Sequence, residues 1–164
     1  NPRDEKKYYL SRPNEAFLMM RALSVGVSNT DLWKIPVGLI KDLLVLDADS
    51  DKDGLSDRME KGLFTNLNQA DSDKDGFTDY LEIDTGNNTL EIGKIKIDQK
   101  IIDKLKGKIL LWNENNGEAW YLNPLDQKRY YLGRPAEAFA IMQHLSIGIS
   151  NKDLNQIPIG PELK

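Results

Sequence analysis

The sequence predicts an α+β protein in which two copies of a small helix-and-strand module, the first one truncated, flank an acidic middle segment. The first observation is an internal repeat with an offset of 122 residues, in which Asn1 answers Asn123. The second is a change within the repeat from the alternating hydrophobic pattern of strands to the spacing typical of helices. The third is charge, because residues 42–86 hold thirteen of the 26 acidic residues and only four of the 22 basic ones.

The repeat divides the chain into three segments. Its strongest match aligns YYLSRP at residues 8–13 with YYLGRP at residues 130–135. The similarity continues as far as Ile35-Pro36, which answers Ile157-Pro158. We therefore predict three units, which are a truncated N-terminal module (1–40), an acidic segment (41–88) and a complete C-terminal module (89–164).

Local signals predict the order of elements in the C-terminal module. Alternating Ile95 and Ile97 indicate a strand in residues 89–97, and Asp98 is placed to cap a short helix that Gly107 ends. The turn sequence Asn-Asn-Gly at 115–117 predicts a hairpin. Its strands are 108–112 and 118–122, and they are followed by a third strand, 128–132, and by a helix that starts at Pro135 and stops near Gly148.

The N-terminal copy retains only the third strand and the following helix. Both helices carry an apolar stripe, made by Ala16, Phe17, Met20 and Leu23 in one copy and by Ala138, Phe139, Met142 and Leu145 in the other. We expect both stripes to be buried, the second one under the hairpin residues Ile109, Leu111, Trp120 and Leu122. The first stripe has no hairpin of its own, so it needs cover from the C-terminal module and strand 89–97, or from a hairpin exchanged with a second chain. The second route leaves self-association through the incomplete N-terminal module open.

Two acidic loops of twelve residues carry the chemistry, Asp49 to Glu60 and Asp71 to Glu82. Each has Asp at positions one, three, five and nine, Gly at six and Glu at twelve. Carboxylates at alternate positions converge on a hard cation that takes six to eight oxygen ligands, and Gly permits the sharp turn. The carbonyl of position seven adds a ligand, position nine binds directly or through water, and both Glu oxygens close the shell.

The pattern predicts two Ca²⁺ ions. Their ligands are Asp49, Asp51, Asp53, Leu55, Asp57 and Glu60 in the first loop, and Asp71, Asp73, Asp75, Phe77, Asp79 and Glu82 in the second. Mg²⁺ is less suited because it requires a tight octahedron. Only ten residues, 61–70, separate the loops, which is too few for the two intervening helices of a paired EF-hand, so we predict a loop with a short helix, repeated.

Composition excludes several classes of function. The acidic segment has a balance of −9 and the rest of the chain +5, which favours a metal over nucleic acid at that segment. The absence of cysteine excludes disulfides and thiol catalysis, and no apolar run is long enough to span a membrane or to serve as a signal peptide. The single histidine, His144, answers Ala22 and lies beside an apolar stripe, so we predict no enzyme. The paired tyrosines, which alternate across a strand, are expected to pack.

The Asp-x-Asp-x-Asp-Gly-x-x-Asp-x-x-Glu loops resemble the thrombospondin type 3-like calcium repeats of exported and cell-surface bacterial proteins. The flanking modules are similar to the Tyr-Tyr-Leu-Gly-Arg-Pro modules of uncharacterised exported bacterial proteins. The first resemblance implies a stiff, calcium-ordered spacer, and the second implies no activity.

We therefore predict a calcium-binding structural or adhesive segment of an extracellular or cell-surface bacterial protein, in which Ca²⁺ rigidifies the connection between modules. One alternative is a calcium-dependent module that binds a glycan or a protein, as dockerin-like segments do, with the partner unknown. Another is a calcium-triggered self-processing segment, suggested by Asn1-Pro2 standing in register with Asn123-Pro124.

Overall fold

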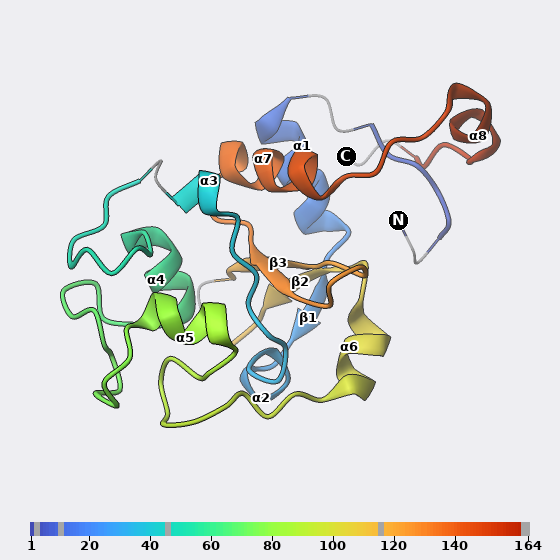
Figure 1. The fold of residues 1–164 in the computed structure, drawn as a ribbon. Helices are drawn as coiled ribbons and strands as arrows, with labels where there is room; N and C mark the ends of the chain where they lie inside the picture. The colour runs from blue at the N-terminus through green and yellow to red at the C-terminus, as the bar shows by residue number, and fades with distance from the viewer. Residues whose placement is uncertain (2–3, 10–11, 45–46, 115–116, 162–164) are drawn as a thin grey trace.

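A four-stranded sheet lies at the centre of the computed structural model, with helices on both of its faces (Figure 1). The structure describes residues 1, 4–9, 12–44, 47–114 and 117–161, without the side chains of Phe17 and Leu44. The strands are β1 Val25–Val27, β2 Ile109–Trp112, β3 Ala119–Leu122 and β4 Arg129–Tyr131. Their order in the sheet is β1-β2-β3-β4, with β1 parallel to β2 and the other pairs antiparallel. The protein is α+β, as predicted.

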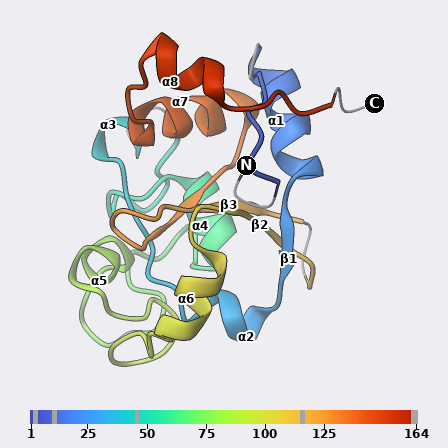
Figure 2. The ribbon, with the colours of Figure 1, turned by 90° about the vertical axis from the view of Figure 1, so that its right-hand side faces the viewer.

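The helices form a layer on each face of the sheet (Figures 1 and 2). Two of them, α1 (Pro13–Ala22) and α7 (Pro135–Leu145), pack against each other on one face. The segments α2 (Asn29–Leu32), α4 (Asp57–Leu63), α5 (Asp79–Thr85) and α6 (Gln99–Leu105) lie on the other. Two short helices complete the described elements, α3 (Lys41–Leu44) and α8 (Asn151–Gln156). No helix in the described part of the chain combines the length and apolar character needed to cross a bilayer.

Most elements of the C-terminal module follow the predicted order. Asp98 caps α6 by accepting hydrogen bonds from the backbone N–H groups of Lys100 and Ile101. The hairpin pairs Leu110 with Trp120, and Gly117 has a φ of 81°, which a residue with a side chain rarely adopts. Residues 115 and 116 of the predicted turn lie outside the described residues.

The strand expected in the N-terminal copy is not formed among residues 4–9, where only an isolated bridge joins Lys7 to Ile159. Two local predictions in the C-terminal module are also wrong. Residues 89–97 do not form a strand, because Gly93 turns the chain and only an isolated bridge joins Asn87 to Lys94. The helix that begins at Pro135 ends at Leu145, before Gly148, and Ser146 already has an extended backbone. The alternation of Ile95 and Ile97 was therefore not sufficient evidence for a strand, since no neighbouring strand pairs with it.

The N-terminal helix stripe is covered within the chain. Ala16 and Met20 are buried in a cluster that includes Ala119, Tyr130, Leu132, Ala138 and Ile141. This cover comes from α7 and the sheet, as the first of the two predicted routes requires, but not from residues 89–97. The side chain of Phe17, predicted to be buried, lies outside the described part of the structure.

The stripe of α7 faces its neighbours differently from the prediction. Phe139, Met142 and Leu145 are only partly buried, while Ala138 and Ile141 are fully buried. The reason is that α7 shares its sheet face with α1, so its contact surface turns toward the small Ala138. Trp120 and Leu122, expected beneath this stripe, point to the opposite face of the sheet.

That opposite face carries the larger core. It packs Leu110, Trp112, Trp120 and Leu122 of the sheet against Leu32 and Ile35 and against four residues of the acidic segment, Leu55, Met59, Leu63 and Ile83. The guanidinium of Arg129 is fully buried between the rings of Trp33, at 5.0 Å, and Trp120, at 4.4 Å. Residues from all three predicted segments therefore share one hydrophobic core.

A substitution in α1 tests the burial of the N-terminal stripe. Met20→Ala is expected to lower the free energy of unfolding by about 2–5 kcal/mol, because it leaves a cavity between α1, α7 and the sheet. Leu18→Ala on the exposed face of the same helix is the matched control and should cost less than about 0.5 kcal/mol. Urea denaturation of both variants gives the comparison, and equal small losses would contradict the packing of α1.

Candidate metal sites

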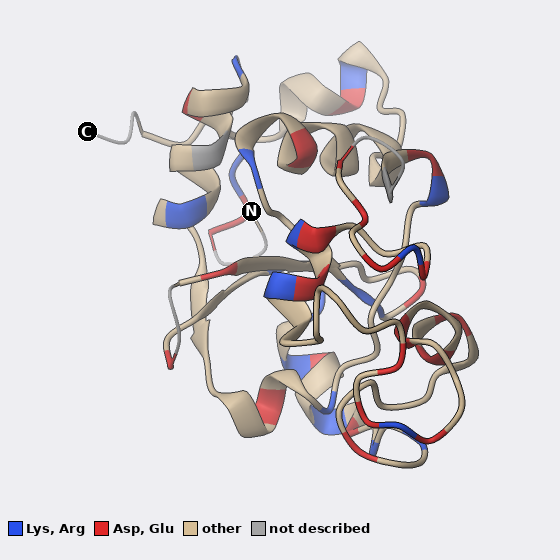
Figure 3. Ribbon diagram, turned by 90° about the vertical axis from the view of Figure 1, so that its left-hand side faces the viewer, with Lys and Arg blue, Asp and Glu red and all other residues tan. Residues whose placement is uncertain are grey.

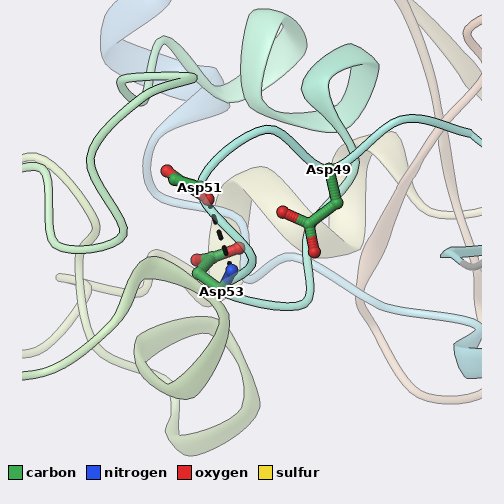
Figure 4. A group of neighbouring side chains, drawn as sticks. All are labelled: Asp49, Asp51 and Asp53. Atoms are coloured by element: carbon green, nitrogen blue, oxygen red, sulfur yellow. Dashed lines mark hydrogen bonds between the residues drawn. The ribbon is translucent and has the colours of Figure 1, made fainter.

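The acidic segment folds into two similar loops, each followed by a short helix. In Figure 3 the acidic residues gather along these two loops beside α4 and α5. Carboxylate oxygens of Asp49, Asp51 and Asp53 lie within 4.8 Å of one another, and so do those of Asp71, Asp73 and Asp75. Figure 4 shows the first group on a single turn of the chain. The structure thus brings together the residues predicted at positions one, three and five of both loops.

Backbone hydrogen bonds to the first Asp of each loop shape the turn. Asp49 accepts from the N–H groups of Lys52, at 2.7 Å, and Gly54, at 3.1 Å. Asp71 accepts in the same way from Lys74, at 2.7 Å, and Gly76, at 3.0 Å. Gly54 has a φ of 104° and Gly76 a φ of 100°, which explains the Gly required at position six.

The Asp at position nine accepts hydrogen bonds from the residue at position two of its loop. Both oxygens of Asp57 accept hydrogen bonds from Ser50, one from its backbone N–H at 2.8 Å and one from its hydroxyl at 2.9 Å. Asp79 holds Ser72 in the same way, at 3.0 and 2.7 Å. The loop pattern predicted a role at the ion for Asp57 and Asp79 but not these hydrogen bonds to Ser50 and Ser72. The signal was present, because Ser occupies position two in both loops.

A hydroxyl at position eight caps the helix that leaves each loop. Ser56 accepts from the N–H of Met59 at the start of α4, and Thr78 accepts from the N–H of Leu81 at the start of α5. An N-cap hydroxyl satisfies one of the free N–H groups of the first turn. Each helix therefore starts at a fixed distance from its loop, which fixes where the Glu at position twelve lies.

Glu60 and Glu82 are fully buried, and both carboxylate oxygens of each lack a hydrogen-bond partner. Of the ten described buried polar side-chain atoms without a partner, six are carboxylate oxygens of the two loops, on Asp51, Glu60, Asp73 and Glu82. A buried carboxylate without donors is strongly destabilising unless a cation lies beside it. The unsatisfied oxygens therefore mark where positive charge belongs.

The electrostatics of the two glutamates are alike. Burial, with the negative charges of Asp51 and Asp53, raises the pKa of Glu60 to about 8. Burial, with the charges of Asp73 and Asp75, raises the pKa of Glu82 to about 8. The repulsion comes mostly from the Asp residues of the same loop, and for Glu60 also from Asp79 of the second loop.

The two loops are joined by a contact that the sequence did not predict. One oxygen of Asp53 accepts from the N–H of Leu55 in its own loop, at 2.7 Å. The other accepts from the N–H of Tyr80 in the first turn of α5, at 3.0 Å. Asp79 is fully buried next to this contact, and burial raises its pKa. The order of the first loop is therefore linked directly to the helix of the second.

The residues at position seven differ between the loops. Their side chains were expected to be free for packing while their carbonyls face the ion. Leu55 is fully buried in the larger core, whereas Phe77 is about half exposed. The first loop is thus fixed to the body of the protein more firmly than the second.

A group of charged side chains connects the first loop to α7. Asp47, just before the loop, pairs with Arg58 of α4 at 2.9 Å and with Arg134 at 3.2 Å. Glu137 of α7 lies 3.5 Å from Arg58 and also pairs with Arg134. Arg58 lowers the pKa of Asp47. These pairs are partly exposed and individually weak, but together they hold the loop against the C-terminal module.

Comparisons with known proteins give no relative for this chain. No protein-family model matches it, and neither the curated proteins nor the solved structures contain a match. What the structure itself supports is two acidic groups that could each hold a metal ion.

Proposed function

We propose that this chain is a non-enzymatic calcium-binding segment of an extracellular or cell-surface bacterial protein, in which two Ca²⁺ ions rigidify the connection between its modules. The observation that carries the proposal is the pair of buried glutamates, Glu60 and Glu82, whose four carboxylate oxygens have no hydrogen-bond donor and whose pKa values are raised by burial and by the charges of the Asp residues. A cation at each loop would satisfy these oxygens together with those of the Asp residues. The resemblance to exported calcium repeats supports the cellular location.

The donor set favours Ca²⁺ over other metals. Each loop offers only oxygen ligands, without histidine or cysteine, which excludes a typical zinc or copper site. Three Asp and one Glu that supplies both oxygens, with a backbone carbonyl, provide the six to eight oxygens that Ca²⁺ prefers. Mg²⁺ holds fewer protein ligands and keeps most of its water.

The surroundings of the loops favour a structural role. Leu55, Met59, Leu63 and Ile83, which belong to the loops and their helices, lie in the larger core against the sheet. An ion that orders the loops would therefore also hold in place the side of the core that these residues form. The ion pairs of Asp47 with Arg58 and Arg134 would link the ordered first loop to the N-terminus of α7.

Calorimetric titration with Ca²⁺ tests the proposal. We expect two ions per chain, with dissociation constants of roughly 10⁻⁴ to 10⁻³ M, the range of extracellular modules. Glu60→Gln or Glu82→Gln should weaken one site at least about tenfold, or about 1.4 kcal/mol, because each removes the ligand that supplies two oxygens. Glu91→Gln, at an exposed acidic residue outside the loops, is the matched control and should leave both sites unchanged.

Mg²⁺ titrated under the same conditions should bind more weakly than Ca²⁺. Finding no heat of binding up to about 10 mM Ca²⁺, ten times the weakest expected dissociation constant, would defeat the proposal. So would equal loss of affinity in the Glu91→Gln control, which would indicate nonspecific attraction to the acidic surface.

A further inference from the structure

The two copies of the repeat reach different environments although their sequences match. In the N-terminal copy, residues 25–38 run along the sheet, where β1 pairs with β2 and α2 follows. In the C-terminal copy the corresponding residues are 147–160, which include α8, and residues 147–149 form no strand. Figures 1 and 2 show α8 lying away from the four-stranded sheet.

The same apolar positions are buried in one copy and exposed in the other. Val27 is 4% exposed and its counterpart Ile149 is 49% exposed. Leu32 and Leu154 are 0% and 36% exposed, and Val37 and Ile159 are 5% and 76% exposed. In the N-terminal copy these residues are covered by the hairpin β2–β3 and by the two acidic loops with their helices.

The helix cap in residues 147–160 is the same as the helix cap in residues 25–38. Ser150 caps α8 through the N–H of Asp153, just as Ser28 caps α2 through the N–H of Asp31. The shared cap shows that the helix of this segment starts at the same position in both copies.

The backbone contact on the far side of the missing hairpin is also retained, as an isolated bridge between Lys7 and Ile159. In the covered copy, Arg129 of β4 bonds to Pro36 and Gly38, at 2.8 and 2.9 Å. In the other copy, Lys7 bonds to Pro158 and Gly160 at the same two distances. The hairpin β2–β3 fills the space between β1 and β4. Residues 147–149 and 7–9 stand at the positions of the two outer strands, but neither forms a strand and no hairpin lies between them among the described residues.

Some polar and aromatic side chains around residues 25–38 recur in the C-terminal copy, and others that contact each other are replaced as a pair. Asn29, which accepts a hydrogen bond from the indole of Trp112 on the hairpin, is conserved in the repeat as Asn151. Trp33 and Arg129, which stack on each other, are replaced together by Asn155 and Lys7. The ammonium of Lys7 donates instead to the carbonyl of Leu154, at 2.6 Å. The C-terminal copy therefore keeps the Asn that contacts the hairpin through Trp112, whereas the Trp and Arg that pack on Trp112 and Trp120 of the hairpin are replaced.

We propose that residues 147–160, together with residues 4–9, form a binding surface for a second calcium-loop and hairpin unit of the kind formed by residues 41–122. The incoming hairpin completes a second four-stranded sheet, with its first strand parallel to residues 147–149 and its second strand antiparallel to residues 7–9. Exchange of hairpins between identical chains would not cover this surface without exposing the other one. The described residues of each chain contain two segments of the 25–38 type and one hairpin, so one segment stays exposed after such an exchange.

Fusion of a second copy of residues 41–122 directly before Asn1 tests the proposal, because this position corresponds to the junction of Leu122 with Asn123. We expect the amide hydrogens of Ile147 and Ile149 to exchange at least about 100-fold more slowly in the fused protein than in the original chain, as ladder amides do. Their rates should approach those of Val25 and Val27, the counterparts whose N–H groups face β2. The same fusion carrying Ile149→Asp and Ile159→Asp is the control and should show no slowing.

Calcium stoichiometry of the fused protein separates this proposal from that of the metal sites. Two additional ions with unchanged exchange at residues 147–149 would overturn the proposed surface and leave the metal sites intact. An added unit that stays unfolded would overturn it as well, since the surface is expected to hold that unit. Concentration-dependent association of the original chain that Ile149→Asp abolishes would show that a second chain is the occupant instead.

Discussion

Removal of Ca²⁺ is expected to lower the unfolding temperature of this protein by roughly 5–15 °C from its value in about 5 mM Ca²⁺. Dissociation constants of roughly 10⁻⁴ to 10⁻³ M give each site about 1–2 kcal/mol at that concentration. The loss extends beyond the loops because Leu55, Met59 and Ile83 belong to the core beneath the sheet. Thermal unfolding followed by circular dichroism, with and without chelator, measures the shift.

The double variant Glu60→Gln and Glu82→Gln is the control for this experiment. Its unfolding temperature should no longer respond to Ca²⁺. In chelator it should be at least as stable as the original chain, because it no longer buries two carboxylates that have no donors. A chelator-insensitive unfolding temperature in the original chain would show that Ca²⁺ has no structural role.

Leu32→Ala is expected to lower the free energy of unfolding by about 2–5 kcal/mol, because Leu32 is fully buried in the larger core. The repeat supplies a matched control, since Leu154 occupies the same position of the other copy at the surface. Leu154→Ala should cost less than about 1 kcal/mol. Chemical denaturation of both variants in saturating Ca²⁺ gives the two values.

Equal losses for the two leucines would contradict the different environments of the copies. A large loss at Leu154 that appears only at high protein concentration would mean that the chain associates through residues 147–160. The comparison therefore also reports on the surface proposed for a second unit.

The elements with strong local signals could be predicted from the sequence. Pro135 at the start of α7, Asp98 at the start of α6 and Gly117 beside the hairpin turn each have a local conformational preference that tertiary packing did not override. The two groups of three Asp could be predicted for the same reason, because each group lies within one short loop.

Contacts between distant segments could not be predicted in this way. The hydrogen bond from Tyr80 to Asp53 and the pairs that Asp47 makes with two arginines depend on how the segments pack. Residues 89–97 failed to form a strand for a related reason, since an alternating pattern becomes a strand only where a neighbour offers hydrogen bonds.

The sequence by itself determined the α+β class, the repeat and the two acidic loops, because each is encoded in neighbouring residues. Only the tertiary structure decided which copy of the repeat is buried. Residues 25–38 and 147–160 have nearly the same pattern and the same helix cap, yet one contributes β1 to the sheet and the other stays exposed. The physical reason is that burial requires a partner surface, and the described part of the chain contains one hairpin for two segments of equal hydrophobic character.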